Sequence, residues 1–143
     1  MRKLLLVGSL MLVMVSCKKD DIKQKENIES QVSTGTWKIS YFSDSGVNET
    51  VNFNGYNFEF KSDGTLTASN GTNTYNGTWS VTDSNSSDDS PNDLDFNINF
   101  NLTNDFEDLN DDWDIISHTD SKLELNDVSG GNGGTDLLTF TKN

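Results

Sequence analysis

Apolar and polar residues alternate with a period of two over most of the chain from residue 37 onward. The clearest run has apolar side chains at five alternate positions, Leu94, Phe96, Ile98, Phe100 and Leu102, with Asp or Asn between them. Successive side chains of a strand point to opposite faces, so this run predicts a strand with one face in a core. Shorter runs predict further strands at residues 37–41, 51–53, 58–60, 66–68, 79–81, 113–115, 123–125 and 138–140.

Turn residues separate these predicted strands. Asn-Gly and Asp-Gly pairs supply the positive φ of tight hairpins, and they lie at residues 54–55, 63–64, 70–71 and 76–77. One stretch predicts a short helix, because Phe106 and Leu109 lie three residues apart after Asn104, a favourable N-cap. Short strands joined by hairpin turns, without crossover helices, predict an all-β antiparallel barrel or sandwich.

The N-terminus follows a different pattern. Arg2 and Lys3 precede an apolar run over residues 4–15 that only Gly8 and Ser9 interrupt. Basic residues followed by a short apolar run and a small residue are typical of a secretory signal peptide. The run is shorter than the roughly 20 residues that a membrane-spanning helix needs, so we expect cleavage after export.

The end of this segment, Met14-Val15-Ser16-Cys17, resembles the lipobox of bacterial lipoproteins. Ser16 and Cys17 fit that motif, and Met14 is a mild departure from its aliphatic position. In that family the Cys sulfur receives a diacylglycerol and the signal is cut before the Cys. The resemblance implies that residues 1–17 are a lipoprotein signal peptide ending at the lipidated Cys17. The alternative is an ordinary secretory signal with an incidental Cys.

The next residues, Lys18-Lys19-Asp20-Asp21, look like the export tag of surface lipoproteins in the Bacteroidota. The resemblance implies an outer-membrane lipid anchor that faces outward, although any polar tether would begin in this way. Residues 18–33 are charged and lack a consistent apolar face, so we expect a flexible tether with a helical turn near residues 22–32. Residues 34–143 then form one domain, because no break in composition divides them.

Removal of the signal peptide makes the chain more acidic. The full chain has 10 basic and 23 acidic residues, and loss of Arg2 and Lys3 changes its formal charge from -13 to -15. Such acidity argues against a nucleic-acid partner, because phosphate binding draws on clustered Lys and Arg. The one Cys excludes a disulfide framework and a four-thiolate zinc site.

Gly35-Thr36-Trp37 opens the first predicted strand of the domain. A Gly-x-Trp at this place is the most widely shared motif of lipocalins. Together with the segments 58–66, 77–81, 112–116 and 138–142, it makes residues 34–143 resemble the lipocalin-like lipoprotein domains of Bacteroidota. The resemblance implies an antiparallel up-and-down eight-stranded barrel in which Gly35 and Trp37 form the structural motif at the base.

The chain departs from lipocalins in two respects. Lipocalins commonly stack an Arg from near the last strand on the motif Trp, and they carry a disulfide. The mature chain has no Arg, so we expect Lys142 to contact Trp37 through a cation–π interaction. Eight short strands have roughly 28 inward positions, and about 23 large apolar residues can be assigned to them. We therefore expect a packed or shallow interior.

Two functions follow from these observations. The resemblance implies non-catalytic binding of a small apolar or amphipathic ligand at the open barrel end, with Trp79, Phe96, Phe100 and Trp113 as candidate binding residues. Core packing is the alternative role for these aromatic residues. The competing function is an interaction or structural module with a filled barrel and loops that contact a protein or a glycan. An enclosed apolar cavity of about 300 Å³ or more would favour the first.

Catalytic and metal sites are not expected. His118 is the only His, and after lipidation no Cys remains to act as a nucleophile. Carboxylates are too numerous for a glycosidase pair to stand out. The acidic loops at residues 83–93 and 105–114 offer oxygen ligands for calcium, but neither matches the helical calcium-binding loop. We expect a monomer that is not an enzyme and carries no cofactor, with a solvated acidic surface.

Overall fold

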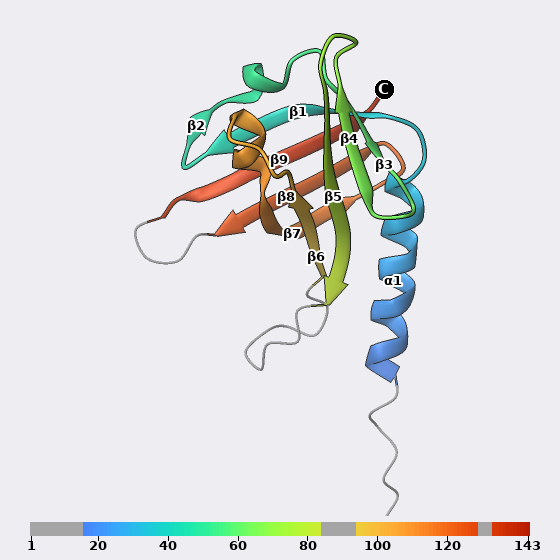
Figure 1. The fold of residues 1–143 in the computed structure, drawn as a ribbon. Coiled ribbons are helices and arrows are strands. Elements are labelled where there is room, and N and C mark those ends of the chain that lie inside the picture. The colour runs from blue at the N-terminus through green and yellow to red at the C-terminus, as the bar shows by residue number, and fades with distance from the viewer. Residues whose placement is uncertain (1–15, 84–93, 129–132) are drawn as a thin grey trace, which may run out of the picture.

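The structure is a computed structural model that describes residues 16–83, 94–128 and 133–143. The predicted signal segment before residue 16 and the acidic stretch 84–93 lie outside these residues. One α-helix, α1 (Ser16–Val32), is followed by strands and two 3₁₀ helices, η1 (Thr50–Phe53) and η2 (Asp105–Leu109) (Figure 1). The strands are β1 (Trp37–Asp44), β2 (Val47–Asn48), β3 (Asn57–Phe60), β4 (Thr65–Ser69), β5 (Thr74–Asp83), β6 (Leu94–Asn99), β7 (Asp111–His118), β8 (Lys122–Val128) and β9 (Thr135–Lys142).

Eight of these strands close into an up-and-down antiparallel barrel. The sheet runs in the order β1-β3-β4-β5-β6-β7-β8-β9, and β9 pairs again with β1. β2 adds two residues that pair with the end of β1. The seam between β1 and β3 has a single register pair, Trp37 with Phe58. The predicted eight-stranded lipocalin-like barrel is confirmed, and the sandwich is excluded.

Apolar side chains fill the barrel. The alternating residues of β6 and the residue after it, Phe96, Ile98 and Phe100, are all buried, as their period predicted. Aromatic rings meet edge to face across the interior, and the ring centroid of Phe60 lies 5.5 Å from that of Phe96 and 5.3 Å from that of Phe140. Such ring pairs stabilise a core beyond the area they bury. The interior is therefore packed.

Two short elements show how far a short apolar pattern in the sequence predicts secondary structure. The strand predicted at residues 51–53 is wrong, because Thr50–Phe53 form η1, with Val51 69% exposed and Phe53 buried. Two apolar residues separated by one are too few to distinguish a strand from a turn of 3₁₀ helix. The short helix predicted after Asn104 is confirmed as η2. The Asn104 side chain accepts a hydrogen bond from the backbone N–H of Phe106 at 3.2 Å.

The flexible tether predicted at residues 18–33 is corrected, because α1 covers almost all of it. Ile28 and Val32 lie four residues apart on one face of this helix, and both are buried against the barrel core. The rest of the helix is polar, and Ile22 is 58% exposed. The helical turn predicted near residues 22–32 lies within α1, but the two core-facing residues gave too weak a period to predict the whole helix. Within the described ranges, no helix is both long and apolar enough to cross a membrane.

The Gly-x-Trp motif connects α1 to the barrel. Gly35 has a φ of 77°, a conformation that favours glycine. Trp37 is fully buried, and its indole N–H donates to the carbonyl of Val32 at 2.9 Å. Lys142 Nζ lies 4.9 Å from the centre of the Trp37 ring, which confirms the predicted cation–π contact. The motif thus closes the barrel base and holds the end of the helix.

Candidate functional site

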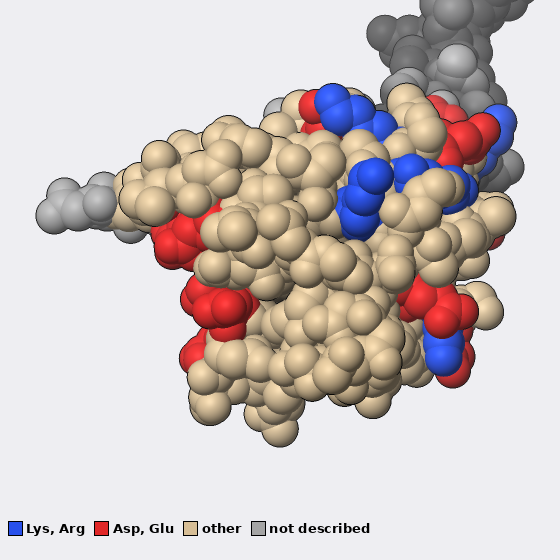
Figure 2. Space-filling view, turned by 90° about the horizontal axis from the view of Figure 1, so that it is seen from above, with Lys and Arg blue, Asp and Glu red and all other residues tan. Residues whose placement is uncertain are grey.

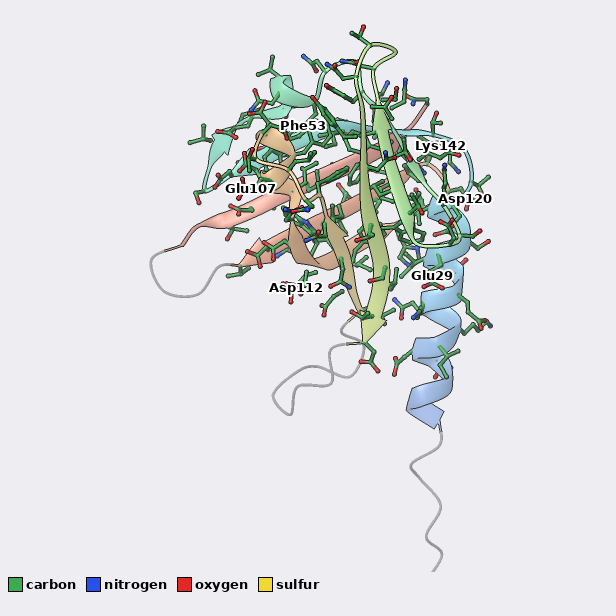
Figure 3. All side chains as sticks on the ribbon, in the orientation of Figure 1. Glu29, Phe53, Glu107, Asp112, Asp120 and Lys142 are labelled. Carbon is green, nitrogen blue, oxygen red and sulfur yellow. The ribbon has the colours of Figure 1, made fainter. Side chains whose placement is uncertain are left out.

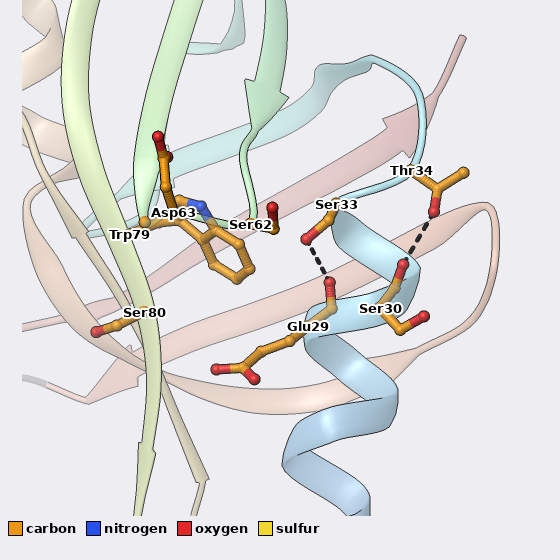
Figure 4. Close-up of a pocket in the computed structure, with 9 residues that line it drawn as sticks. Glu29, Ser30, Ser33, Thr34, Ser62, Asp63, Trp79 and Ser80 are labelled. Atoms are coloured by element: carbon orange, nitrogen blue, oxygen red, sulfur yellow. Dashed lines mark hydrogen bonds between the residues drawn. The ribbon is translucent and has the colours of Figure 1, made fainter.

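A groove lies where the last turns of α1 meet the barrel wall. It has a volume of about 570 Å³ and is open to solvent (Figure 4). Seven of its nine lining residues carry a hydroxyl or carboxylate group, and one indole ring forms an apolar wall. The lining residues are Glu29, Ser30, Ser33, Thr34, Ser62, Asp63, Gly64, Trp79 and Ser80. This groove, called here the helix–barrel groove, combines three segments that are distant in sequence.

The turn between β3 and β4 positions the indole wall. Gly64 has a φ of 85°, which lets the turn bring its carbonyl to the backbone N–H of Trp79 at 2.9 Å. The indole N–H of Trp79 donates to the carbonyl of Lys61 at 2.8 Å. The ring stacks on Phe96, with their centroids 5.6 Å apart. Trp79 is therefore fixed on both sides, and only its edge reaches the groove.

The helix supplies the opposite wall. The hydroxyl of Ser33 donates to the carbonyl of Glu29 at 2.6 Å, and the hydroxyl of Thr34 donates to the carbonyl of Ser30 at 2.9 Å (Figure 4). Both hydroxyl oxygens keep free lone pairs that can accept a hydrogen bond. The helix end thus presents two oriented acceptors to the groove.

Two carboxylates give the groove a negative potential. The pKa of Asp63 lies below its ordinary value, chiefly because the backbone N–H of Thr65 donates to the carboxylate and secondly because the Thr65 hydroxyl does so. Glu29 lies 3.7 Å from Lys25 Nζ in an exposed ion pair. Negative charge on both walls disfavours anionic ligands and suits neutral molecules rich in hydroxyl groups.

A second groove runs along another face of α1. It has a volume of about 720 Å³ and is more open, with His118 as its one lining residue from the barrel. His118 Nδ1 lies 2.7 Å from the side-chain oxygen of Gln31. The sole His therefore contacts the helix. The other residues that line this second groove are polar and belong to α1, at positions 20, 23, 24, 26, 27 and 30.

The candidate ligand-binding residues occupy different environments. Phe96, Phe100 and Trp113 are no more than 1% exposed, so they pack in the core. The indole N–H of Trp113 donates to the carbonyl of Leu109 at 3.0 Å. Trp79, 7% exposed, is the candidate that lines the helix–barrel groove. Cys17 lies in the first turn of α1, and lipid attachment to it stays a prediction.

The barrel end far from α1 is closed by an aromatic cluster around Phe106. This ring lies within 4.8–6.0 Å, centroid to centroid, of five other rings. They are Phe53, Tyr56, Phe58, Tyr75 and Phe100. η1 and η2 thus place Phe53 and Phe106 over the opening, and we call this region the aromatic end.

Acidic residues surround the aromatic end. Burial raises the pKa of Asp108, and the charges of Asp44, Asp105 and Glu107 raise it further. The pKa of Asp111 is raised to about 6, mainly by burial and then by its hydrogen bond with the Asp112 side chain. Among the described side chains, no three His, Cys, Asp or Glu residues form a group that could hold a metal ion.

The sequence did not single out most residues of the helix–barrel groove. Ser30 and Ser33 were assigned to a tether, Thr34 to the start of the domain, and Ser62 and Asp63 to an ordinary turn. The only sequence signals were the spacing of Ile28 and Val32 and the Asp63-Gly64 turn. Neither indicates that a helix end and a hairpin turn meet, because that contact is made by tertiary folding.

Comparison with known proteins supports the architecture. No protein-family model and no curated protein matches the sequence. The crystal structure of a DUF4847 family protein from Bacteroides vulgatus resembles this chain with a TM-score of 0.53. The two are 22% identical, and the match covers 81% of this chain and 97% of the other. The likeness shows the fold alone.

Proposed function

We propose that the protein is a lipid-anchored, surface-exposed lipoprotein of the outer membrane whose filled barrel serves as a non-catalytic interaction module. Support for the anchor comes from Ser16-Cys17 at the end of the only long apolar run, and support for display comes from Lys19-Asp20-Asp21. We propose an interaction module rather than a carrier because the barrel interior is packed with apolar side chains.

The proposed binding site is the helix–barrel groove. Its hydroxyl groups, two carboxylates and one indole edge suit an uncharged, hydroxyl-rich ligand such as a glycan, which can exchange hydrogen bonds with the hydroxyl and carboxylate groups and pack against the indole edge. The lining residues come from the rigid barrel and a helix end held by hydrogen bonds. Such a site needs little rearrangement on binding, which favours affinity.

The carrier function remains the competing proposal because of the lipocalin-like fold. An apolar ligand would have to displace core rings, since Phe96, Phe100 and Trp113 fill the interior. Native mass spectrometry of protein purified from cells distinguishes the two. A tightly bound apolar molecule of defined mass would favour the carrier and contradict the filled-barrel module.

Glycan binding can be tested by NMR titration with a panel of neutral oligosaccharides. We expect shifts of the amide signals of Ser62, Gly64 and Ser80 at micromolar to millimolar ligand. Ser80→Tyr places a ring in the groove and should abolish them. Ser40→Tyr is the matched control, because Ser40 is also an exposed serine on a strand but lies on β1, outside the groove. Equal shifts in the two variants, or none with any oligosaccharide, would contradict the proposal.

The anchor and its location need separate tests. A Cys17→Ala variant should leave the membrane fraction, because no acyl chain can then be attached through the sulfur. Continued membrane association of this variant would count against lipidation. Protease added to intact cells should digest the domain if it faces outward, and protection in cells that are shown to be intact would count against surface display.

A further inference from the structure

We propose that α1 is a rigid spacer that fixes the height and orientation of the barrel above the membrane. The inference rests on the proposed lipid anchor at Cys17, which lies in the first turn of the helix. A flexible tether would leave the barrel free to turn in any direction. A helix that is bonded to the barrel at one end and to lipid at the other end would not.

The carbonyl groups at the C-terminal end of α1 are bonded to groups beyond the helix. A helix normally leaves its last four carbonyls without partners inside the helix. Here the carbonyl of Val32 accepts from the Trp37 indole, and that of Gln31 accepts from Lys142 Nζ at 3.5 Å. The hydroxyl groups of Ser33 and Thr34 bond to the two preceding carbonyls.

Side chains hold the same end of the helix from two more directions. Ile28 and Val32 are 0% and 1% exposed in the barrel core. On another face, Gln31 contacts His118 at 2.7 Å. Contacts from β1, β7 and β9 therefore fix both the position and the rotation of the helix end. This is more restraint than a linker needs and points to a mechanical role.

The helix projects well beyond its contacts with the barrel. From Cys17 to Val32 it has a length of about 23 Å at 1.5 Å per residue, and its first half extends past the barrel wall (Figure 1). It lies alongside β5, and its N-terminal half projects toward the end at which that strand finishes (Figure 1). The lipid is therefore expected beyond the Asp83 end of β5, and the turn between β4 and β5 is expected on the far side.

The face of the barrel that is turned away from the anchor contains segments without any charged residue. Residues 50–58 and 68–76, which form η1, the start of β3, the end of β4 and the start of β5, contain no charged residue. Figure 2 shows this face as a broad uncharged area with acidic and basic side chains at its edges. Glu107 and Asp112 lie on the side of the barrel opposite Lys142 and Glu29 (Figure 3). The spacer would thus present an uncharged surface outward from an acidic protein.

The rigidity of the spacer can be measured without the lipid. In the mature protein with Cys17→Ser, spin labels are attached at Gln24→Cys on α1 and Thr72→Cys in the turn between β4 and β5, both exposed positions. Electron paramagnetic resonance should give one narrow distance distribution. A broad distribution typical of a flexible chain would overturn the proposal.

The contacts at the helix end can be tested in the same protein. Lys142→Met removes the ammonium group that contacts Trp37 and Gln31, and it should broaden the distance distribution. Lys38→Met is the control, because Lys38 is an exposed lysine on β1 and should leave the distribution unchanged. Equal broadening in both variants would contradict the role assigned to Lys142.

Orientation is tested with the lipidated protein in vesicles that carry energy-transfer acceptors on their headgroups. Donor dyes at Thr72→Cys and Thr82→Cys lie about 33 Å apart along the chain at 3.3 Å per residue. We expect several-fold more transfer from position 82. Replacement of residues 20–27 by Gly and Ser should bring the two signals together. Equal transfer in the unmodified helix would overturn the orientation, whereas failure to join vesicles would contradict the anchor and leave the spin-label result standing.

Discussion

The two ends of the barrel are closed by different kinds of interaction. At the aromatic end, five rings from loops, strands and 3₁₀ helices pack around Phe106, and acidic residues surround them. At the helix end, Trp37, Lys142 and His118 bond to polar groups of α1. Ring packing at the aromatic end contributes stability by burying apolar area, whereas the hydrogen bonds at the helix end fix the direction of α1. The comparison indicates that one end stabilises the domain and the other sets its orientation.

The strongest test of this difference is Phe106→Ala. Phe106 is 3% exposed and contacts five rings, so its removal leaves a large cavity. We expect a loss of about 3–5 kcal/mol in the free energy of unfolding, measured by urea denaturation. Ile116→Ala, at a side chain 59% exposed, should change it by no more than about 0.5 kcal/mol. If Phe106→Ala lowered the free energy of unfolding by less than Trp37→Phe does, the roles assigned to the two ends would be reversed.

Trp37→Phe tests the helix end. It keeps a ring but removes the donor to Val32 and leaves that carbonyl buried without its partner. We expect a loss of about 2–3 kcal/mol, since an unpaired buried acceptor and a small cavity both contribute. Hydrogen exchange should accelerate in residues 28–34 more than in β8. Uniform acceleration across the domain would indicate that Trp37 serves general stability only.

Asp111→Asn probes the acidic surroundings of the aromatic end. The pKa of Asp111 is raised from 3.8 to about 6 in the folded protein, so the folded state binds this proton more tightly than the unfolded state. Stability should therefore rise as the pH falls from about 6 toward 4, and the ionised group should destabilise the protein at pH 7. We expect Asn to add about 1 kcal/mol at neutral pH, because water screens the partly exposed carboxylate.

The measurement is urea denaturation of Asp111→Asn between pH 4 and 8, with Asp120→Asn, at an exposed turn position, as the control. The gain should shrink below pH 6 as Asp111 becomes protonated in the unmodified protein. A gain that does not change with pH, or one shared by the control, would exclude burial of the Asp111 charge as its cause.

The smallest effect is expected for Lys142→Met. Lys142 Nζ lies 4.9 Å from the Trp37 ring centre. Loss of a cation–π contact of this kind should cost about 0.5–1 kcal/mol by thermal or urea denaturation. Lys142→Arg should retain most of the stability, since its guanidinium group can also stack on the ring. Destabilisation as large as that of Phe106→Ala would show that the two ends contribute equally.

Local patterns predicted the parts of the fold in which neighbours along the chain decide the outcome. The buried apolar positions of β6 and the Asn104 cap of η2 were confirmed. The Lys142 contact with Trp37 was also confirmed, but it joins residues far apart in the chain and was expected from the lipocalin resemblance. The strand predicted at residues 51–53 was wrong, and the flexible tether predicted at residues 18–33 is a helix, of which only a turn near residues 22–32 was expected. Few apolar residues carry a signal in either segment, and both elements gain their stability from the barrel rather than from their own sequence.

The candidate site divides in the same way. Trp79 was named from the sequence and lines the helix–barrel groove, whereas Phe96, Phe100 and Trp113 are buried in the core. Apolar period alone cannot distinguish an inward ring that lines a cavity from one that fills it. The polar lining from α1 carries no periodic signal at all.

The sequence by itself determined an antiparallel all-β domain with an aromatic-rich core and an acidic surface, because alternation, turn residues and charge are local properties. The choice of a barrel over a sandwich came from the lipocalin resemblance, and the structure confirms it. Tertiary structure alone decided that residues 16–32 form a helix, that its end is bonded to the base of the barrel, and that a groove lies between them. The physical reason is that a mostly polar helix, in which only Ile28 and Val32 face the core, becomes stable only where a folded barrel buries these two residues and supplies donors to its last carbonyls.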